Sequence, residues 1–248
     1  QIKQHIQTHF SDWTAFKPIN QQLFDNFWQQ HYLPLPHINP DWYILLTASI
    51  TTDEVLQTIS KLPNGKACGS TGISYEMIKH LGNNCILALT ALFNWCLSQN
   101  NIPKLWKHGR IYPIPKTNSF DGNLNLTRPI SLIEHARKIY TKILTNRLNQ
   151  TFSQHPILSP FNYVALPGNS TSISIHILNN LIEDANCNYK ELWLLSQNIS
   201  KAYDFVNFSL FKHSLSCLSL PQPIINILFD LLVNRRNKVI TNFGLTLL

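Results

Sequence analysis

The segment from 192 to 206 carries residue types that could do chemistry at close spacing. It reads Leu-Trp-Leu-Leu-Ser-Gln-Asn-Ile-Ser-Lys-Ala-Tyr-Asp-Phe-Val, so an apolar run is followed by an amide, a cation and an acid at Asn198, Lys201 and Asp204. Such a short apolar run predicts a buried strand. Polar groups at the carboxyl end of a buried strand, before a turn into a helix, are a common active-site arrangement in α/β proteins. The segment therefore predicts a site at the end of this strand.

Two cations flank a predicted hairpin in the middle of the chain. The stretch before Lys116 alternates like an edge strand, which tolerates Pro113 and Pro115, and Thr127–Leu132 predicts the second strand. Lys116 and Arg128 then stand at the two sides of the turn. Ordinary solvated surface charges would explain this spacing. Two cations on a flexible hairpin can also close over a phosphate chain and neutralise the charge that develops on a leaving group.

Two further segments are glycine-rich or basic. Residues 65–79 hold three glycines with Lys66 among them, but their spacing is not that of a P-loop, and a turn before a helix explains them. A helix predicted over 133–152 has an apolar face, and its remaining surface could follow a nucleic-acid backbone or simply be solvated. The basic residues of that surface are His135, Arg137, Lys138, Lys142 and Arg147.

The segment around Asn198 resembles the first palm motif of reverse transcriptases from non-LTR retrotransposons (LINE and jockey-like), which reads Asp-Ile-x-Lys-Ala-Phe/Tyr-Asp-x-Val. Three earlier segments are similar to the same family, and they occur in the same order along the chain. These are the glycine-rich run from Gly65, in which Cys68 and Thr71 replace the usual Pro and Asp, the Arg-Pro-Ile-Ser-Leu run from Arg128, and residues 157–171.

The resemblance implies an α+β fold of the right-hand polymerase type, mostly helical with short antiparallel strands. It divides the chain into a lead-in and linker region (1–50), a fingers-like region (51–171) and a partial palm (172–248) that stops before the acidic-pair motif. Within this division, Thr51 and Glu54 have the spacing of a capping box at the start of a helix. A helix predicted over 172–185 corresponds to the helix that packs under the palm sheet in the family.

The resemblance also implies roles for five residues. Asn198 stands at the position of the catalytic Asp that binds Mg²⁺ in this family. Ala202 and Tyr203 stand where the incoming nucleotide is bound, with Tyr203 against its sugar, and Lys116 and Arg128 stand where its triphosphate is held. Because Mg²⁺ prefers anionic oxygen, the neutral amide of Asn198 is a weak replacement, and no two Asp are adjacent anywhere in the sequence.

We therefore expect a fragment of a retrotransposon RNA-directed DNA polymerase that does not bind Mg²⁺ productively and is catalytically inactive as it stands. The implied partners are an RNA template, a DNA primer and dNTP. The alternative is a noncatalytic, basic nucleic-acid-binding remnant. A third reading is an unrelated α/β protein whose basic balance is incidental.

The composition suits a polyanionic partner. Twenty Lys and Arg against 13 Asp and Glu give a net charge of +7, and 44% hydrophobic residues exclude a disordered chain. Five scattered cysteines predict neither a disulfide framework nor a zinc site. With no secretory leader and no apolar segment long enough for a bilayer, we expect an intracellular protein of the cytoplasm or nucleus, not secreted and without a membrane partner. An unfinished palm sheet predicts exposed apolar surface and low solubility.

Overall fold

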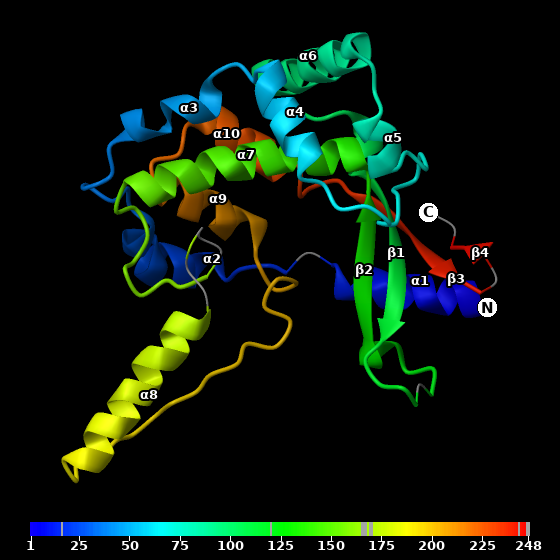
Figure 1. Cartoon of the computed structure of the whole chain (residues 1–248). Coiled ribbons are helices and arrows are strands. Elements are labelled where there is room, and N and C mark those ends of the chain that lie inside the picture. Colours follow the sequence, from blue (N-terminus) through cyan, green and yellow to red (C-terminus); the bar gives the residue numbers. More distant parts are fainter. Residues whose placement is uncertain (16, 120, 165–167, 169–170, 243, 247–248) are drawn as a thin grey trace.

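The computed structural model of the chain describes residues 1–248 apart from 16, 120, 165–167, 169–170, 243 and 247–248. Helices form most of the body, and a small sheet lies at one side (Figure 1). The α-helices are α1 (Ile2–Trp13), α2 (Gln21–Leu23), α3 (Ile44–Thr47), α4 (Thr52–Ser60), α5 (Tyr75–Lys79), α6 (Asn83–Gln99), α7 (His135–Gln154), α8 (Thr171–Cys187), α9 (Phe208–Cys217) and α10 (Gln222–Asp230). The strands are β1 (His108–Pro115), β2 (Thr127–Ile133), β3 (Arg236–Thr241) and β4 (Gly244–Leu245).

Helix α7 is the centre of the main core. Its residues Ile139, Ile143 and Leu144 recur at helical spacing, are at most 1% exposed, and pack with side chains from α4, α6 and α10. Tyr43, which immediately precedes α3, lies in the same core, and its hydroxyl donates to the carbonyl of Leu218 at 2.7 Å. The core therefore joins the region predicted as a lead-in to the C-terminal helices.

Helix α4 begins with the predicted capping box. The Thr51 hydroxyl accepts from the backbone N–H of Glu54 at 3.2 Å, and the Glu54 carboxylate accepts from the backbone N–H of Thr51 at 2.9 Å. Two of the N–H groups that no helical carbonyl can reach are satisfied in this way. The cap sets the direction in which the chain leaves residue 51.

The sheet is mixed. Within the described residues, the strand order is β2-β1-β3-β4. Strands β1 and β2 form the predicted antiparallel hairpin, but β3 runs parallel to β1, with His108 opposite Arg236 and Ile111 opposite Val239. This parallel pair differs from the expected antiparallel strands, because the chain returns through the core by α10 before it enters β3. Beyond Ile111, β1 pairs with β2 alone, which is where its prolines lie.

Helix α1 covers one face of the sheet. Phe10 is 3% exposed and packs on Ile111 of β1 and Val239 of β3, with Ile6 at the edge of this second, smaller cluster. Figure 1 shows α1 crossing behind the hairpin and running alongside β3.

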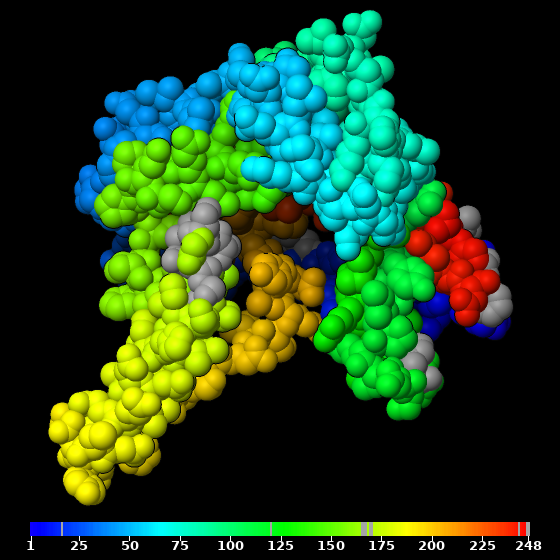
Figure 2. Space-filling view, in the orientation of Figure 1, coloured from blue at the N-terminus to red at the C-terminus, as the bar shows by residue number. Residues whose placement is uncertain are grey.

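Helix α8 projects away from the body together with the segment that follows it (Figures 1 and 2). We call α8 and residues 188–206 the apolar arm. The expectation that this helix packs under the sheet is wrong: Ile177 is 43% exposed and Leu181 51%, while Ala185, near its end, is buried. It is α1, not α8, that packs against the sheet, through Phe10 on Ile111 and Val239. Part of the preceding segment 157–171, at 165–167 and 169–170, lies outside the described residues.

Candidate nucleic-acid interface

The β1–β2 hairpin carries the two predicted phosphate-binding cations on one face. Arg128 lies directly opposite Ile114, and the backbone N–H of Lys116 donates to the carbonyl of Leu126 at 2.8 Å. Because side chains alternate along a strand and opposite residues share a face, Lys116 and Arg128 stand on the same side. Both side chains are exposed. The predicted hairpin is confirmed, and the contact of its cations with a nucleotide stays a prediction.

Aromatic and apolar side chains share this face with the cations. Tyr112 is 50% exposed, and Ile130, opposite it, is 42% exposed. We call Tyr112, Ile114, Lys116, Arg128 and Ile130 the hairpin face. Exposed rings beside cations are the combination with which proteins bind single-stranded nucleic acid, since bases stack on the rings while the cations meet phosphates.

The polar segment after α8 does not follow the predicted strand. Residues 191–199 are neither helix nor strand, and Trp193 and Leu195 are 89% and 95% exposed. The expected buried strand is wrong, since this stretch pairs with none of the described strands. Asn198 lies on this exposed stretch.

The end of the apolar arm turns sharply and docks on the N-terminal region. The backbone N–H groups of Asp204 and Phe205 donate to the carbonyl of Lys201, at 2.9 and 3.2 Å. The Lys201 ammonium lies 4.0 Å from the centre of the Trp13 ring, a close cation–π contact. Ala202 and Tyr203, at the outside of this turn, are exposed, Tyr203 by 94%.

Asn207 fastens the turn to the rest of the body. Its side-chain N–H donates to the carbonyl of Lys17 at 2.6 Å, and its side-chain oxygen accepts from the backbone N–H groups of Ser209 and Leu210 at the start of α9. The amide therefore caps α9 and holds the N-terminal segment at the same time.

A pocket of about 260 Å³ lies between this turn, α1 and the hairpin. Asn125, from the hairpin loop, lines it, and the carbonyl of Asn125 accepts from the Lys116 ammonium at 3.1 Å. The hairpin and the polar segment 192–206, both singled out from the sequence, thus meet at this pocket. Asn198 is not among the residues that line it. The lining residues are His9, Asp12, Trp13, Lys17, Asn125, Lys201, Asp204 and Phe205. Burial, together with nearby His5 and Lys201, lowers the pKa of His9.

The described residues do not fit the Mg²⁺ site that the resemblance implies. Asn198 offers a neutral amide oxygen on an exposed stretch, whereas Mg²⁺ is held by carboxylates in octahedral geometry. In the described part of the chain, no three His, Cys, Asp or Glu side chains gather closely enough to hold a metal ion.

The glycine-rich loop is bound to an internal carboxylate. Glu134 accepts from the Ser70 hydroxyl at 2.7 Å, from the Thr71 hydroxyl at 2.5 Å and from the Thr71 backbone N–H at 3.0 Å. Burial raises the pKa of Glu134, but these hydrogen bonds outweigh it and hold the pKa below its ordinary value. These donors of Ser70 and Thr71 are therefore engaged within the protein, and the segment forms a turn before the helix α5.

Gly69 is required for this approach. A Cβ at Gly69 would lie 2.7 Å from the backbone nitrogen of Glu134 and 2.8 Å from its Cα. Behind the loop, the ring of His135 stacks on Tyr75 at 3.7 Å between centroids, and the Arg110 guanidinium donates to the carbonyl of Ser70 at 3.2 Å. The loop is thus fixed to the base of the hairpin.

The basic residues of α7 do not form a solvated face. His135, Arg137 and Arg147 are all at most 5% exposed, so the expectation of one continuous cationic surface is wrong for these three. Lys142 is exposed, and Lys138 is half-buried. The Arg137 guanidinium donates to the carbonyls of Trp106 and Leu231, at 2.8 and 2.5 Å, and so joins α7 to the segment before β1 and to the end of α10.

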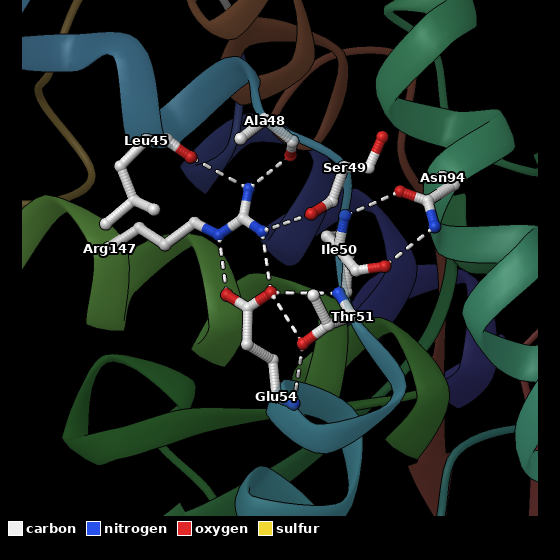
Figure 3. Close-up of polar contacts among 8 residues, drawn as sticks. All are labelled: Leu45, Ala48, Ser49, Ile50, Thr51, Glu54, Asn94 and Arg147. Carbon is white, nitrogen blue, oxygen red and sulfur yellow. Dashed lines mark hydrogen bonds and ion pairs between the residues drawn. The ribbon is translucent and has the colours of Figure 1, made fainter.

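Arg147 binds the segment that leads into α4 (Figure 3). Its guanidinium donates to both carboxylate oxygens of Glu54 at 2.7 Å and to the carbonyls of Leu45, Ala48 and Ser49 at 2.6 to 3.1 Å. These contacts use all five N–H groups of the side chain. Hydrogen bonds from Arg147 hold the pKa of Glu54 below its ordinary value.

Asn94 completes this anchoring from α6. Its side chain accepts from the backbone N–H of Ile50 at 2.7 Å and donates to the carbonyl of the same residue at 2.9 Å (Figure 3). The cluster around Arg147 is structural, and it fixes the scaffold behind the hairpin.

Helix α1 is the part of the site that sequence reasoning missed. It contributes His9, Asp12 and Trp13 to the pocket beside the hairpin. The signal was present in the sequence, because Ile6, Phe10 and Trp13 recur at helical spacing. The many polar residues between these positions, mostly Gln, His and Thr, make the apolar face harder to recognise.

Comparison with known proteins shows what the chain is similar to. No protein-family model matches it. In sequence, however, it is homologous to RNA-directed DNA polymerases of non-LTR retrotransposons, which confirms the resemblance seen in its motifs. The mixed helical and stranded architecture with its small sheet is compatible with part of a polymerase fold.

Particular relatives come from fruit fly and frog. The chain is 27% identical over 175 residues to a probable RNA-directed DNA polymerase from transposon BS of Drosophila melanogaster, a match that covers 70% of the chain and 18% of that protein. It is 26% identical over 159 residues to the RNA-directed DNA polymerase from mobile element jockey of the same species, over 59% of the chain and 17% of that protein. An uncharacterized 149 kDa protein of transposon TX1 from Xenopus laevis is 22% identical over 99% of the chain and 18% of its own length. The chain thus spans about a fifth of the length of these relatives.

Proposed function

We propose that this chain is part of the reverse transcriptase of a non-LTR retrotransposon and that its contribution is to bind nucleic acid. In this proposal, residues 51–171 correspond to fingers and 172–248 to part of the palm of a right-hand polymerase. The observation that carries it is the hairpin face: Lys116 and Arg128 stand on one side of a two-stranded hairpin with Tyr112, in a chain whose relatives are named as RNA-directed DNA polymerases.

The hairpin face supports contact with a phosphate chain. Lys116 and Arg128 have no acidic partner among the ion pairs of the described residues, so both charges are available to a polyanion. On the other face of the hairpin, Ile111 packs against Phe10 of α1, whereas the hairpin face carries exposed side chains. Figure 2 shows a hollow between this hairpin and the apolar arm, beneath α7. RNA template, DNA primer and dNTP are the ligands that the proposal assigns to this side.

In this proposal, the chain by itself does not polymerise nucleotides. Phosphoryl transfer of this kind relies on two metal ions that clamp the attacking and leaving oxygens. Asn198 replaces a carboxylate at the position that matches the family's metal-binding Asp, and the sequence contains no adjacent pair of Asp. Mg²⁺ would serve the complete enzyme. An intracellular location, in cytoplasm or nucleus, belongs to the same proposal.

RNA binding at several salt concentrations tests the proposal. Each cation that meets a phosphate of a single strand adds about 0.7 to the slope of log affinity against log salt. We expect the double substitution Lys116→Gln and Arg128→Gln to lower the affinity for single-stranded RNA and to reduce this slope by about 1.4. Lys142→Gln, which removes an exposed charge from α7, is the matched control. An unchanged slope in the double variant would remove the hairpin face from the interface.

A polymerase assay separates the enzyme from a binding remnant. With primer, template, dNTP and Mg²⁺, neither the chain nor its Asn198→Asp variant should extend the primer. Extension by the chain as it stands would contradict the inactive assignment. A polymerase fragment and a noncatalytic remnant should both bind RNA with the salt dependence described above and without extending the primer. This outcome alone does not separate them. Extension by an Asn198→Asp chain joined to the following palm segment of a relative would assign it to the enzyme.

A further inference from the structure

A second pocket, of about 440 Å³, lies on the other side of α1, between this helix and the strands β1 and β3. Figure 1 shows α1 running alongside β3 at this place. From α1, Gln7, Ser11 and Thr14 line the pocket at spacings of three and four residues, so they share one face of the helix. From the strand side, Arg235 and Arg236 line it.

The charged residues that line this pocket are all positive. Its lining contains two arginines and no Asp or Glu. The buried Nε of Arg235 has no hydrogen-bond partner within the described structure, and Arg235 takes part in none of the ion pairs found there. A partly buried guanidinium without a counter-charge is costly, because its hydration has been lost and nothing replaces it.

Neighbouring groups add to this positive charge and do not neutralise it. Arg137, close enough to Arg235 for their charges to interact, is itself buried and bonded only to carbonyl oxygens of the backbone. Burial accordingly lowers the pKa of Arg235, with no acidic neighbour to oppose it.

We propose that this pocket binds a phosphate group, with the Arg235 guanidinium as its principal ligand. A planar guanidinium matches two phosphate oxygens, and Arg236, Ser11 and Gln7 supply a second cation and neutral donors around it. The group could be inorganic phosphate or a phosphodiester of a nucleic-acid strand that continues past the hairpin. The second source rests on the proposed function, whereas the first does not.

The test uses the full chain and two ligands, inorganic phosphate and oligouridylate, titrated at constant ionic strength. Phosphate should raise the melting temperature of the wild type and of the Lys142→Gln control. In Arg235→Gln, phosphate should bind about tenfold or more weakly, the loss expected for a charged hydrogen bond.

A second variant, Gln7→Glu, places a carboxylate in the pocket from the half-buried face of α1. It should raise the melting temperature in chloride, because the carboxylate neutralises Arg235, and it should abolish the response to phosphate. These two changes have opposite signs, and a loss of packing cannot produce both. This variant decides the question if Arg235→Gln does not fold.

The two ligands identify the source of the phosphate. Competition between oligouridylate and phosphate, lost in both variants, assigns the pocket to the nucleic-acid backbone. If phosphate binding depends on Arg235 but oligouridylate does not compete with phosphate, the pocket binds a free anion. No phosphate response in the wild type, or an equal response in Gln7→Glu, overturns the proposal. Failure of the hairpin variant to change RNA binding would count against the proposed function alone.

Discussion

Replacement of Arg147 by methionine should destabilise the fold severely, although nothing in the sequence marks this residue as more than one cation of a basic helix. Methionine keeps much of the aliphatic length and removes the five donors. The change strands three backbone carbonyls, those of Leu45, Ala48 and Ser49, and the carboxylate of Glu54.

The size of the effect follows from these partners. A buried acceptor left unpaired costs about 1–3 kcal/mol, and the three carbonyls lie on half-buried or exposed residues, so the lower end applies to each. Glu54 keeps its bonds to Thr51 and is 31% exposed, so water can replace part of what it loses. We expect a loss of about 3–4 kcal/mol in the free energy of unfolding, a large part of the 5–15 kcal/mol usual for a domain.

Urea unfolding followed by circular dichroism measures this loss. Lys142→Met is the matched control, because it removes a charge from an exposed position of the same helix and should change the stability by about 0.5 kcal/mol or less. Arg147→Lys should fall between the two, since an ammonium has three donors and cannot serve five acceptors. Equal midpoints for Arg147→Met and Lys142→Met would refute the reasoning.

Three further predictions concern the same scaffold. Because hydrogen bonds from Arg147 lower the pKa of Glu54, the pair contributes fully above the ordinary pKa of 4.5, and its contribution is lost as the pH falls through the lowered value. The unfolding free energy of the wild type should therefore fall more steeply on acidification than that of Arg147→Met, and parallel pH profiles would contradict this. Gly69→Ala should cost about 1–3 kcal/mol by denaturant unfolding, because its Cβ meets backbone, whereas Gly82→Ala meets nothing within 4 Å. Trp193→Ser should reduce self-association in sedimentation velocity without changing the unfolding free energy, since the ring is 89% exposed; undiminished association would show that the apolar arm is not responsible.

Local patterns in the sequence predicted local structure well. The capping box at Thr51 and Glu54, the core face of α7 and the β1–β2 hairpin all formed as expected. Each depends on residues that are close in the chain, so spacing alone specifies it. The resemblance to non-LTR retrotransposon enzymes was confirmed by homology to RNA-directed DNA polymerases, whereas the roles of the individual motif residues stay predictions.

Partners that lie far apart in the chain could not be predicted. Whether Arg147 faces solvent or the carbonyls near residue 48 depends on how α7 packs, and periodicity does not record that. Leu192–Leu195 has the composition of a buried strand, but whether such a run joins a sheet depends on how distant segments pack, and here it pairs with none of the described strands. The position of Asn198 relative to the hairpin cations stays a prediction for the same reason.

The long-range closure of the core affects how the protein is made. Tyr43 is bonded to the carbonyl of Leu218, and Ile102 donates to Asp230, 128 residues further along. A nascent chain emerging from the ribosome can therefore form its capped helices and its hairpin early, yet it cannot complete the core around α7 until α10 has been synthesised. During that delay the apolar sides of the early helices stay open to contact with other nascent chains.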